Sequence, residues 1–131
     1  MRADGNRDAE WGEWFGAGAW LNAMLPSVPT PGNHEYSGST LAPYWRTQFA
    51  FPDNGPQGTG PIYDAIKGTA FYTDYQGVRF VALNSNVSAV ASALRPEFLE
   101  VQRAWLESVL LLGTGVVDGG LGPPVGTRAV V

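Results

Sequence analysis

The chain contains a single histidine, His34, and it lies in the segment Gly32-Asn33-His34-Glu35. An asparagine side-chain oxygen is a hard, neutral ligand that binds a divalent metal ion without adding negative charge. A histidine titrates near neutral pH and can donate a proton or stabilise developing charge. Gly32 allows the backbone to bend close to a bound ion. These residue types therefore suit metal binding at Asn33 and proton transfer at His34.

The same segment is also typical of an ordinary surface turn, because glycine and asparagine are common turn-forming residues. One asparagine and one histidine do not make a metal site, since three or more protein ligands are expected around a catalytic ion. The residue types alone leave both interpretations open. Under either one, the elements on both sides must hold the turn in place.

A helix is predicted before the turn. Between residues 7 and 25, apolar and small residues recur at three- and four-residue steps, as one face of a helix requires: Trp11, Trp14, Phe15, Gly18, Leu21 and Leu25. Pro26 is expected to end this helix. Residues 27–30 are predicted to form a short strand that leads into a tight turn at 31–35, because the prolines there bias their neighbours away from helix.

A hairpin is predicted after the turn. Residues 41–50 suit one or two helical turns, and residues 52–61 read as a loop. Thr69–Tyr75 and Val78–Leu83 are rich in β-branched and aromatic residues, and the two residues between them, Gln76-Gly77, fit a primed hairpin turn. The second run is apolar on both faces, so we expect both faces to be covered.

The clearest predicted helix has Pro96 at its first position and stops at Gly113. Its predicted buried stripe is Phe98, Val101, Trp105, Val109 and Leu112.

The turn and several later segments carry a resemblance to a known family. Pro31-Gly32-Asn33-His34-Glu35-Tyr36 resembles the Gly-Asn-His-Glu signature of the calcineurin-like metallophosphoesterases. Further segments look like those of purple-acid-phosphatase-type members and follow in that family's order: Tyr44–Arg46, Phe51-Pro52, Phe71–Tyr75, Val78–Asn86 and Gln102–Glu107. The resemblance runs from about Asp8 to Leu110. It implies an α/β fold, in which this chain forms an incomplete part of a metallophosphoesterase-type β-sandwich flanked by helices.

The resemblance implies phosphoester hydrolysis at two metal ions of the Fe, Zn or Mn class, with a small-molecule phosphoester as substrate. Two such ions clamp a phosphate and activate a hydroxide for in-line attack. Asn33 would then ligate one metal ion, and His34 would contact the phosphate and help to protonate the leaving group. Glu35 matches the signature, but it looks like a supporting residue and not a catalytic one.

The sequence departs from the family on both sides of the turn. The family's other ligands come from Asp- and His-bearing segments, whereas Asp4 and Asp8 are the only aspartates upstream and no histidine follows His34. Residues 113–131 form a Gly/Pro-rich tail that differs from the family's continuation. We therefore expect 1–112 to be a partial metallophosphoesterase domain, a central piece of a longer enzyme, with a divergent or disordered tail.

The composition limits the classes of partner that this chain is expected to bind. The 131 residues carry 8 Lys+Arg against 12 Asp+Glu, a net charge of -4, which argues against binding nucleic acid by electrostatic attraction. The apolar run Val109–Leu112 is far shorter than the roughly 20 residues needed to span a bilayer, and no signal peptide is visible. The family is often exported, but the compartment is not readable here. A partial domain leaves apolar faces uncovered, so self-association is expected.

Two other classes of protein stay open. One is a non-catalytic structural or binding remnant that kept the packing segments and lost the ligands. The other is a small carbohydrate-binding domain that uses exposed aromatic residues. Helical spacing favours core packing of Trp11, Trp14 and Trp20 over such a platform.

Overall fold

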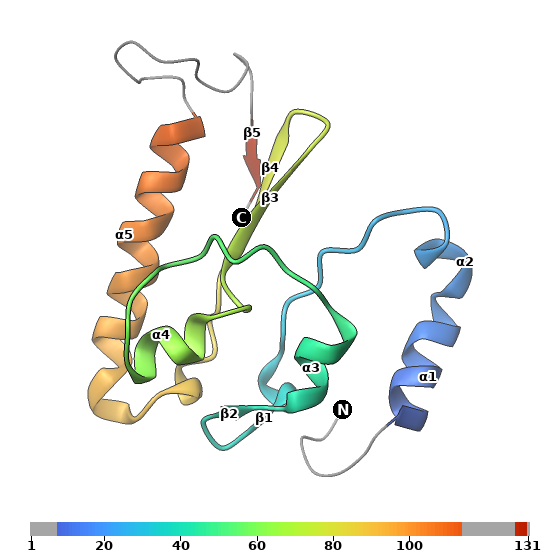
Figure 1. Cartoon of the computed structure of the whole chain (residues 1–131), viewed down its shortest axis with the longest axis horizontal. Coiled ribbons are helices and arrows are strands. Elements are labelled where there is room, and N and C mark those ends of the chain that lie inside the picture. The colour runs from blue at the N-terminus through green and yellow to red at the C-terminus, as the bar shows by residue number, and fades with distance from the viewer. Residues whose placement is uncertain (1–7, 114–127, 131) are drawn as a thin grey trace.

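The computed structural model describes residues 8–113 and 128–130, and it mixes helices with small sheets (Figure 1). The predicted α/β class is confirmed at this level. In chain order the elements are α1 (Asp8–Ala17), α2 (Ala19–Asn22), the 3-10 turn η1 (Asn33–Glu35), β1 (Tyr36–Ser37), β2 (Thr40–Leu41), α3 (Pro43–Gln48), α4 (Pro61–Ile66), β3 (Phe71–Tyr75), β4 (Val78–Ala82), the 3-10 turns η2 (Val87–Ala89) and η3 (Ser92–Leu94), α5 (Arg95–Gly113) and β5 (Arg128–Val130).

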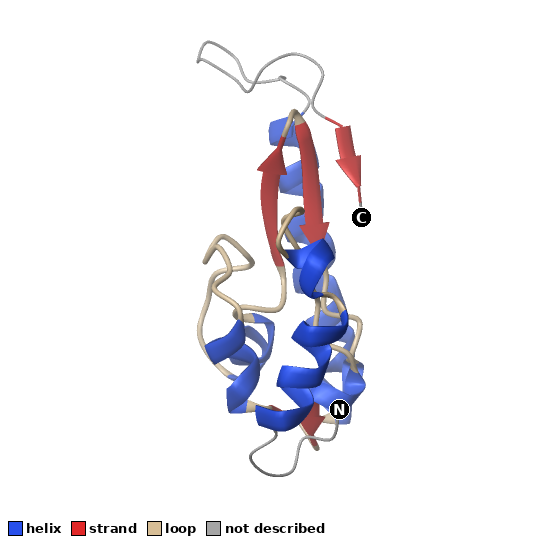
Figure 2. Ribbon diagram, turned by 90° about the vertical axis from the view of Figure 1, so that its right-hand side faces the viewer, coloured by secondary structure: helices blue, strands red, loops and turns tan. Residues whose placement is uncertain are grey.

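The predicted hairpin is confirmed as β3 and β4, which pair antiparallel with Tyr75 opposite Val78. The two turn residues both have positive φ, 50° at Gln76 and 79° at Gly77, as a type I′ turn requires. Strand β5 adds to the sheet parallel to β4, so the end of the tail contributes a strand. Figure 2 shows the hairpin at one end of the molecule, with β5 beside it.

Helix α5 begins at Arg95, one residue before the predicted first position Pro96, and ends at Gly113 as predicted. Phe98 is fully buried and Val109 is buried, while Val101 and Trp105 are half-buried, so the expected stripe faces the interior. The Leu112 side chain lies outside the described residues. Gln102 is also buried, one turn after Phe98, which the sequence did not predict.

The N-terminal helix differs from its prediction. It ends at Ala17, and Gly18, with φ −102° and ψ 13°, separates it from the single turn α2. The residues of the predicted face that follow this interruption do not pack inward. Trp11 is buried, but Trp14 is 41% and Trp20 is 68% exposed, so the expected core packing of these two residues is wrong. Leu21 and Leu25 are exposed as well.

Two segments between the helices were assigned incorrectly from the sequence. Residues 27–30 form no strand, because the flanking prolines cannot donate hydrogen bonds to a ladder and no strand described in the structure pairs with them. The predicted loop ends one residue earlier than expected, and Pro61 begins α4. Proline suits a first helical position, where its missing N–H would have no partner.

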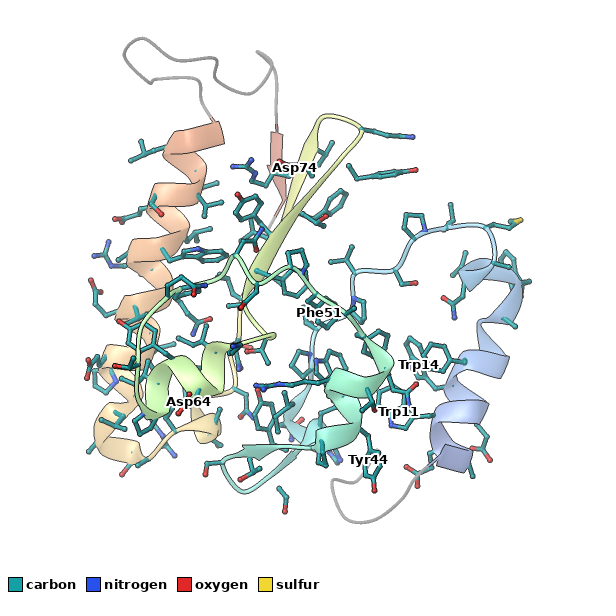
Figure 3. The ribbon with its side chains drawn as sticks, viewed as in Figure 1. Trp11, Trp14, Tyr44, Phe51, Asp64 and Asp74 are labelled. Carbon is teal, nitrogen blue, oxygen red and sulfur yellow. The ribbon has the colours of Figure 1, made fainter. Side chains whose placement is uncertain are left out.

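The interior has two parts. One cluster lies among β1, α4, η2 and α5 and consists of buried residues: Tyr36, Ile62, Ile66, Ala70, Ala89, Val90 and Phe98. The other is a chain of aromatic rings that links α1 to α3 and then to β3: Trp11, Phe15, Trp45, Phe49, Phe51 and Phe71. Figure 3 shows Trp11 and Trp14 pointing from α1 toward α3. Aromatic contacts therefore hold α1 against the rest of the molecule.

The loop at 52–60 is held firmly against the hairpin. The Asn54 side chain accepts a hydrogen bond from Tyr72 N (3.1 Å) and donates one to Tyr72 O (3.0 Å), as a neighbouring strand would do. Trp105 Nε1 donates to Asn54 O (3.1 Å), which ties the same residue to α5. At Gly55 a Cβ atom would lie 2.1 Å from the carbonyl oxygen of Ala70, so only glycine fits there.

Candidate functional site

The Gly32–Glu35 turn closes on itself. Glu35 Oε2 accepts a hydrogen bond from Gly32 N (2.7 Å), and Glu35 N donates to Gly32 O (3.1 Å). The bond from Gly32 N to the Glu35 carboxylate is the half of a capping box that the N3 side chain supplies, and the other bond joins the two backbones because glycine has no side chain. The supporting role expected for Glu35 is thus a hydrogen bond to the backbone of its own turn. Asn33 and His34, in the middle of the turn, are exposed to solvent.

The turn is joined to a short hairpin on its C-terminal side. Ala42 N donates to Glu35 O (2.8 Å), and β1 pairs with β2 through Tyr36 and Leu41. Helix α3 begins at Pro43, directly after this hairpin. The turn therefore has a fixed backbone on one side and two free polar side chains on the other.

A buried polar network lies behind the turn, and Asn84 is its centre. Asn84 is 3% exposed and lies two residues after the end of β4. Its Nδ2 donates to Tyr36 Oη (2.7 Å) and to Thr69 Oγ1 (2.9 Å). Burial raises the pKa of the Tyr36 hydroxyl, which therefore remains protonated at neutral pH. The residue that directly follows the Gly-Asn-His-Glu segment is thus anchored in the core.

The remaining polar groups of Asn84 fix its orientation. Its Oδ1 accepts a hydrogen bond from Asn86 N (3.0 Å), and a backbone N–H can only donate. The oxygen must therefore face Asn86, which leaves Nδ2 facing the two hydroxyls. Gln102 completes the set: Asn84 N donates to Gln102 Oε1 (2.7 Å), and Gln102 Nε2 donates to Asn84 O (3.1 Å). The buried Gln102 thus links the segment after β4 to α5.

A cavity of about 570 Å³ lies between the β1–β2 hairpin, α3 and α4, and none of the residues Gly32–Glu35 lines it. Tyr36 and Leu41 line it, together with the charged residues Arg46 and Asp64. Arg46 Nη2 donates to Lys67 O (2.9 Å), so its guanidinium is held at the end of α4. The volume is in the range of small-molecule sites, which are mostly apolar with a few polar groups.

The turn by itself does not fit a two-metal site. Two metal ions need several carboxylate, imidazole or amide donors between them. Within residues 8–113 and 128–130, no three His, Cys, Asp or Glu side chains gather closely enough to hold a metal ion. The turn offers only the Asn33 amide oxygen and the His34 imidazole, so it could supply one part of such a site and not the whole.

The structure adds supporting residues that the sequence did not single out. Tyr36, Asn84 and Gln102 lie in segments that carry the family resemblance, but no role was predicted for them. The signal for Gln102 was its spacing, four residues after Phe98 and three before Trp105 on the buried stripe. No comparable signal marks Asn84, because its partners Tyr36, Thr69 and Gln102 lie far from it and from one another in the chain.

No family model matches the chain, and neither the curated proteins nor the solved structures include a match. In the part of the chain that the structure describes, no helix is both long and apolar enough to cross a membrane.

Proposed function

We propose that this chain is part of a phosphoester hydrolase of the dinuclear-metal metallophosphoesterase type, similar to purple acid phosphatases. The Gly32–Glu35 turn supplies one metal ligand, Asn33, and one residue that contacts the phosphate, His34. The remaining ligands come from segments outside the described residues. The substrate class is a small-molecule phosphoester, and the metal ions are of the Fe, Zn or Mn class.

The observation that carries this proposal is the construction of the turn. Asn33 and His34 are exposed, while Glu35 and Tyr36, the next two residues, fix the backbone from behind. Functional side chains need rigid support to hold a productive geometry. An ordinary surface turn has no need of a buried tyrosine and a buried asparagine to hold it. This support favours a site over a simple connection.

The proposed chemistry assigns His34 two tasks. When bound, the metal ions would polarise the phosphate and supply the nucleophile. His34 would donate a hydrogen bond to a phosphoryl oxygen and pass a proton to the leaving oxygen. Its exposure on the turn leaves the imidazole accessible to a substrate. No carboxylate on the turn competes for the imidazole by a short contact, since Glu35 is bonded to Gly32 N.

The finer fold assignment is part of the same proposal. The sheet of β3, β4 and β5, with α5 beside it, would form one portion of a two-sheet sandwich flanked by helices. The pairing of β4 with β5 in parallel supports a mixed sheet that can be extended by further strands.

The nucleotide sequence on both sides of the coding segment tests this proposal. We expect Asp- and His-bearing segments of the family type, upstream and downstream, in one of the reading frames. Their absence from every frame would contradict the assignment to this family. Determining the flanking nucleotide sequence requires no folded protein, so the outcome of this test does not depend on the stability of the chain.

A second candidate is a non-catalytic binding or structural protein of the same fold. The lack of a third metal donor among the described residues favours it, as does the 570 Å³ cavity. Metal analysis of the protein purified together with its flanking segments separates the two functions. Two equivalents of tightly bound metal support the enzyme, whereas none, together with ligand binding in the cavity, supports the binding protein.

A further inference from the structure

The buried network behind the turn has two arms that begin at the same atom. Asn84 Nδ2 donates to Tyr36 Oη and to Thr69 Oγ1. The first arm leads to the turn, because Tyr36 lies two residues after His34 and is 7% exposed. The second arm leads to α4, because Thr69 Oγ1 also lies 2.8 Å from Ile66 O and 3.1 Å from Ala65 O. One amide group therefore joins the turn to the core.

The orientation of this amide cannot reverse without loss. If Asn84 were flipped, its oxygen would leave Asn86 N, a donor that is 3.0 Å away in the observed orientation. Gln102 holds the backbone of Asn84 by two further hydrogen bonds, so the residue cannot shift along the strand direction. A buried polar group pays a large penalty for each lost partner. The position of Tyr36 Oη is thus set by a fully bonded group.

We propose that Asn84 is a positioning residue, which sets the place of the Asn33–His34 turn through the Tyr36 hydroxyl. This inference deepens the proposed function and rests on it, since the turn is the site it positions. Asn84 does not touch the substrate region itself. It lies 51 residues after Asn33 in the chain and acts through one hydrogen bond of 2.7 Å.

The single histidine provides the measurement. The His34 Cε1–Hε1 cross-peak in an NMR spectrum of the whole chain has no other histidine to overlap with. We expect Asn84→Ala to move this cross-peak in the wild-type background. In a Tyr36→Phe background the same substitution should leave it in place, because the connecting hydroxyl is gone. Thr69→Val is the matched control: it removes the other hydroxyl bonded to Asn84 and should leave His34 unmoved.

The proposal is overturned if Asn84→Ala moves the His34 cross-peak equally in both backgrounds, or if Thr69→Val moves it as far as Asn84→Ala does. Either result would mean a general loosening of the core. If Asn84→Ala does not fold, Asn84→Ser replaces it: its short side chain keeps an oxygen for a hydrogen bond and loses the amide nitrogen that faces the two hydroxyls. The same two comparisons then decide.

A titration with Mn²⁺ separates this inference from the proposed function. We expect the Mn²⁺ concentration that halves the His34 signal to rise in Asn84→Ala, because the turn is no longer held in place, and to change little in Thr69→Val. If Mn²⁺ leaves Asn33 and His34 unaffected in the wild-type chain, the proposed function fails. The metal-free comparison of cross-peaks still decides the role of Asn84.

Discussion

Arg79 is a charged residue in the interior, and its ion pair with Asp74 gives a quantitative prediction for the free energy of unfolding. Its side chain is 8% exposed, and it forms a two-point ion pair with Asp74: Nε to Oδ1 and Nη2 to Oδ2, both 2.8 Å. Its Nη1 donates to Val109 O (3.0 Å), and its Cζ lies 4.3 Å from the centre of the Tyr72 ring. The guanidinium therefore joins the hairpin to the end of α5.

The magnitude follows from the exposure of the two partners. Removing one partner of a fully buried ion pair costs about 3–5 kcal/mol, whereas an exposed pair is worth about 0–1 kcal/mol. The Asp74 side chain is 48% exposed, so solvent screens part of the interaction. We expect Asp74→Asn to lower the free energy of unfolding by about 2 kcal/mol, between these limits, because Arg79 is left buried without a counter-charge.

The assay is a double-mutant cycle measured by urea unfolding at pH 7. In an Arg79→Met background no buried charge remains, so Asp74→Asn should cost less than about 0.5 kcal/mol. An equal cost of Asp74→Asn in both backgrounds would refute this reasoning. So would a cost below about 0.5 kcal/mol in the wild-type chain, since the pair would then behave as a surface pair.

The same pair gives a pH dependence with a definite sign. Hydrogen bonds from Arg79 lower the pKa of the Asp74 carboxyl in the folded chain below its ordinary value. The unfolded chain then binds a proton more readily, so stability from this group is complete above a pH of about 4 and is lost as the pH falls through the folded pKa. The difference in stability between wild type and Asp74→Asn should therefore narrow below that pH.

Three further predictions follow from other parts of the molecule. Gly55→Ala should lower the free energy of unfolding by about 2 kcal/mol, because the new Cβ would lie 2.1 Å from Ala70 O. The control Gly12→Ala, whose Cβ would have no atom within 4 Å, should raise the free energy of unfolding by up to about 1 kcal/mol. Equal effects of the two substitutions in urea unfolding would contradict the close approach at Gly55. The exposed apolar side chains of Trp20, Met24 and Leu25 should drive self-association. Replacing these three residues with serine should therefore lower the sedimentation coefficient at high protein concentration, while the control Leu99→Ser on α5 should leave it unchanged. A wild-type chain that stays monomeric would refute this prediction. The isolated chain should hydrolyse an aryl phosphate little faster than buffer does, because the described residues lack a full set of metal donors, and strong hydrolysis that His34→Ala abolishes would contradict that expectation.

The sequence predicted the elements whose local chemistry is unambiguous. Gln76-Gly77 between two β-rich runs predicted the hairpin, because few residue pairs tolerate two positive φ angles. Pro96 and Gly113 likewise predicted the two ends of α5 to within one residue. Where burial depends on distant partners, local patterns failed. Trp20 has the spacing of a core residue, but the interruption at Gly18 leaves it 68% exposed.

The same difference between local and distant signals applies to the candidate site. Asn33 and His34 could be selected from the sequence because their residue types carry chemistry wherever the chain places them. The support behind them could not be selected, since Asn84 gains its meaning from Tyr36, Thr69 and Gln102, which lie 48, 15 and 18 residues away in the chain. No periodicity links such positions. Only the folded chain brings them together.

The central claim, that the Gly32–Glu35 turn carries a metal ligand at Asn33 beside a phosphate-contacting His34, is tested most directly by a Mn²⁺ titration of the whole chain followed by NMR. We predict that paramagnetic broadening appears first at the Asn33 side-chain amide and the His34 imidazole, and that Asn33→Ala weakens the broadening at His34. Broadening at His34 that Asn33→Ala leaves unchanged, or broadening that appears first at exposed carboxylates such as Asp53, would contradict the claim.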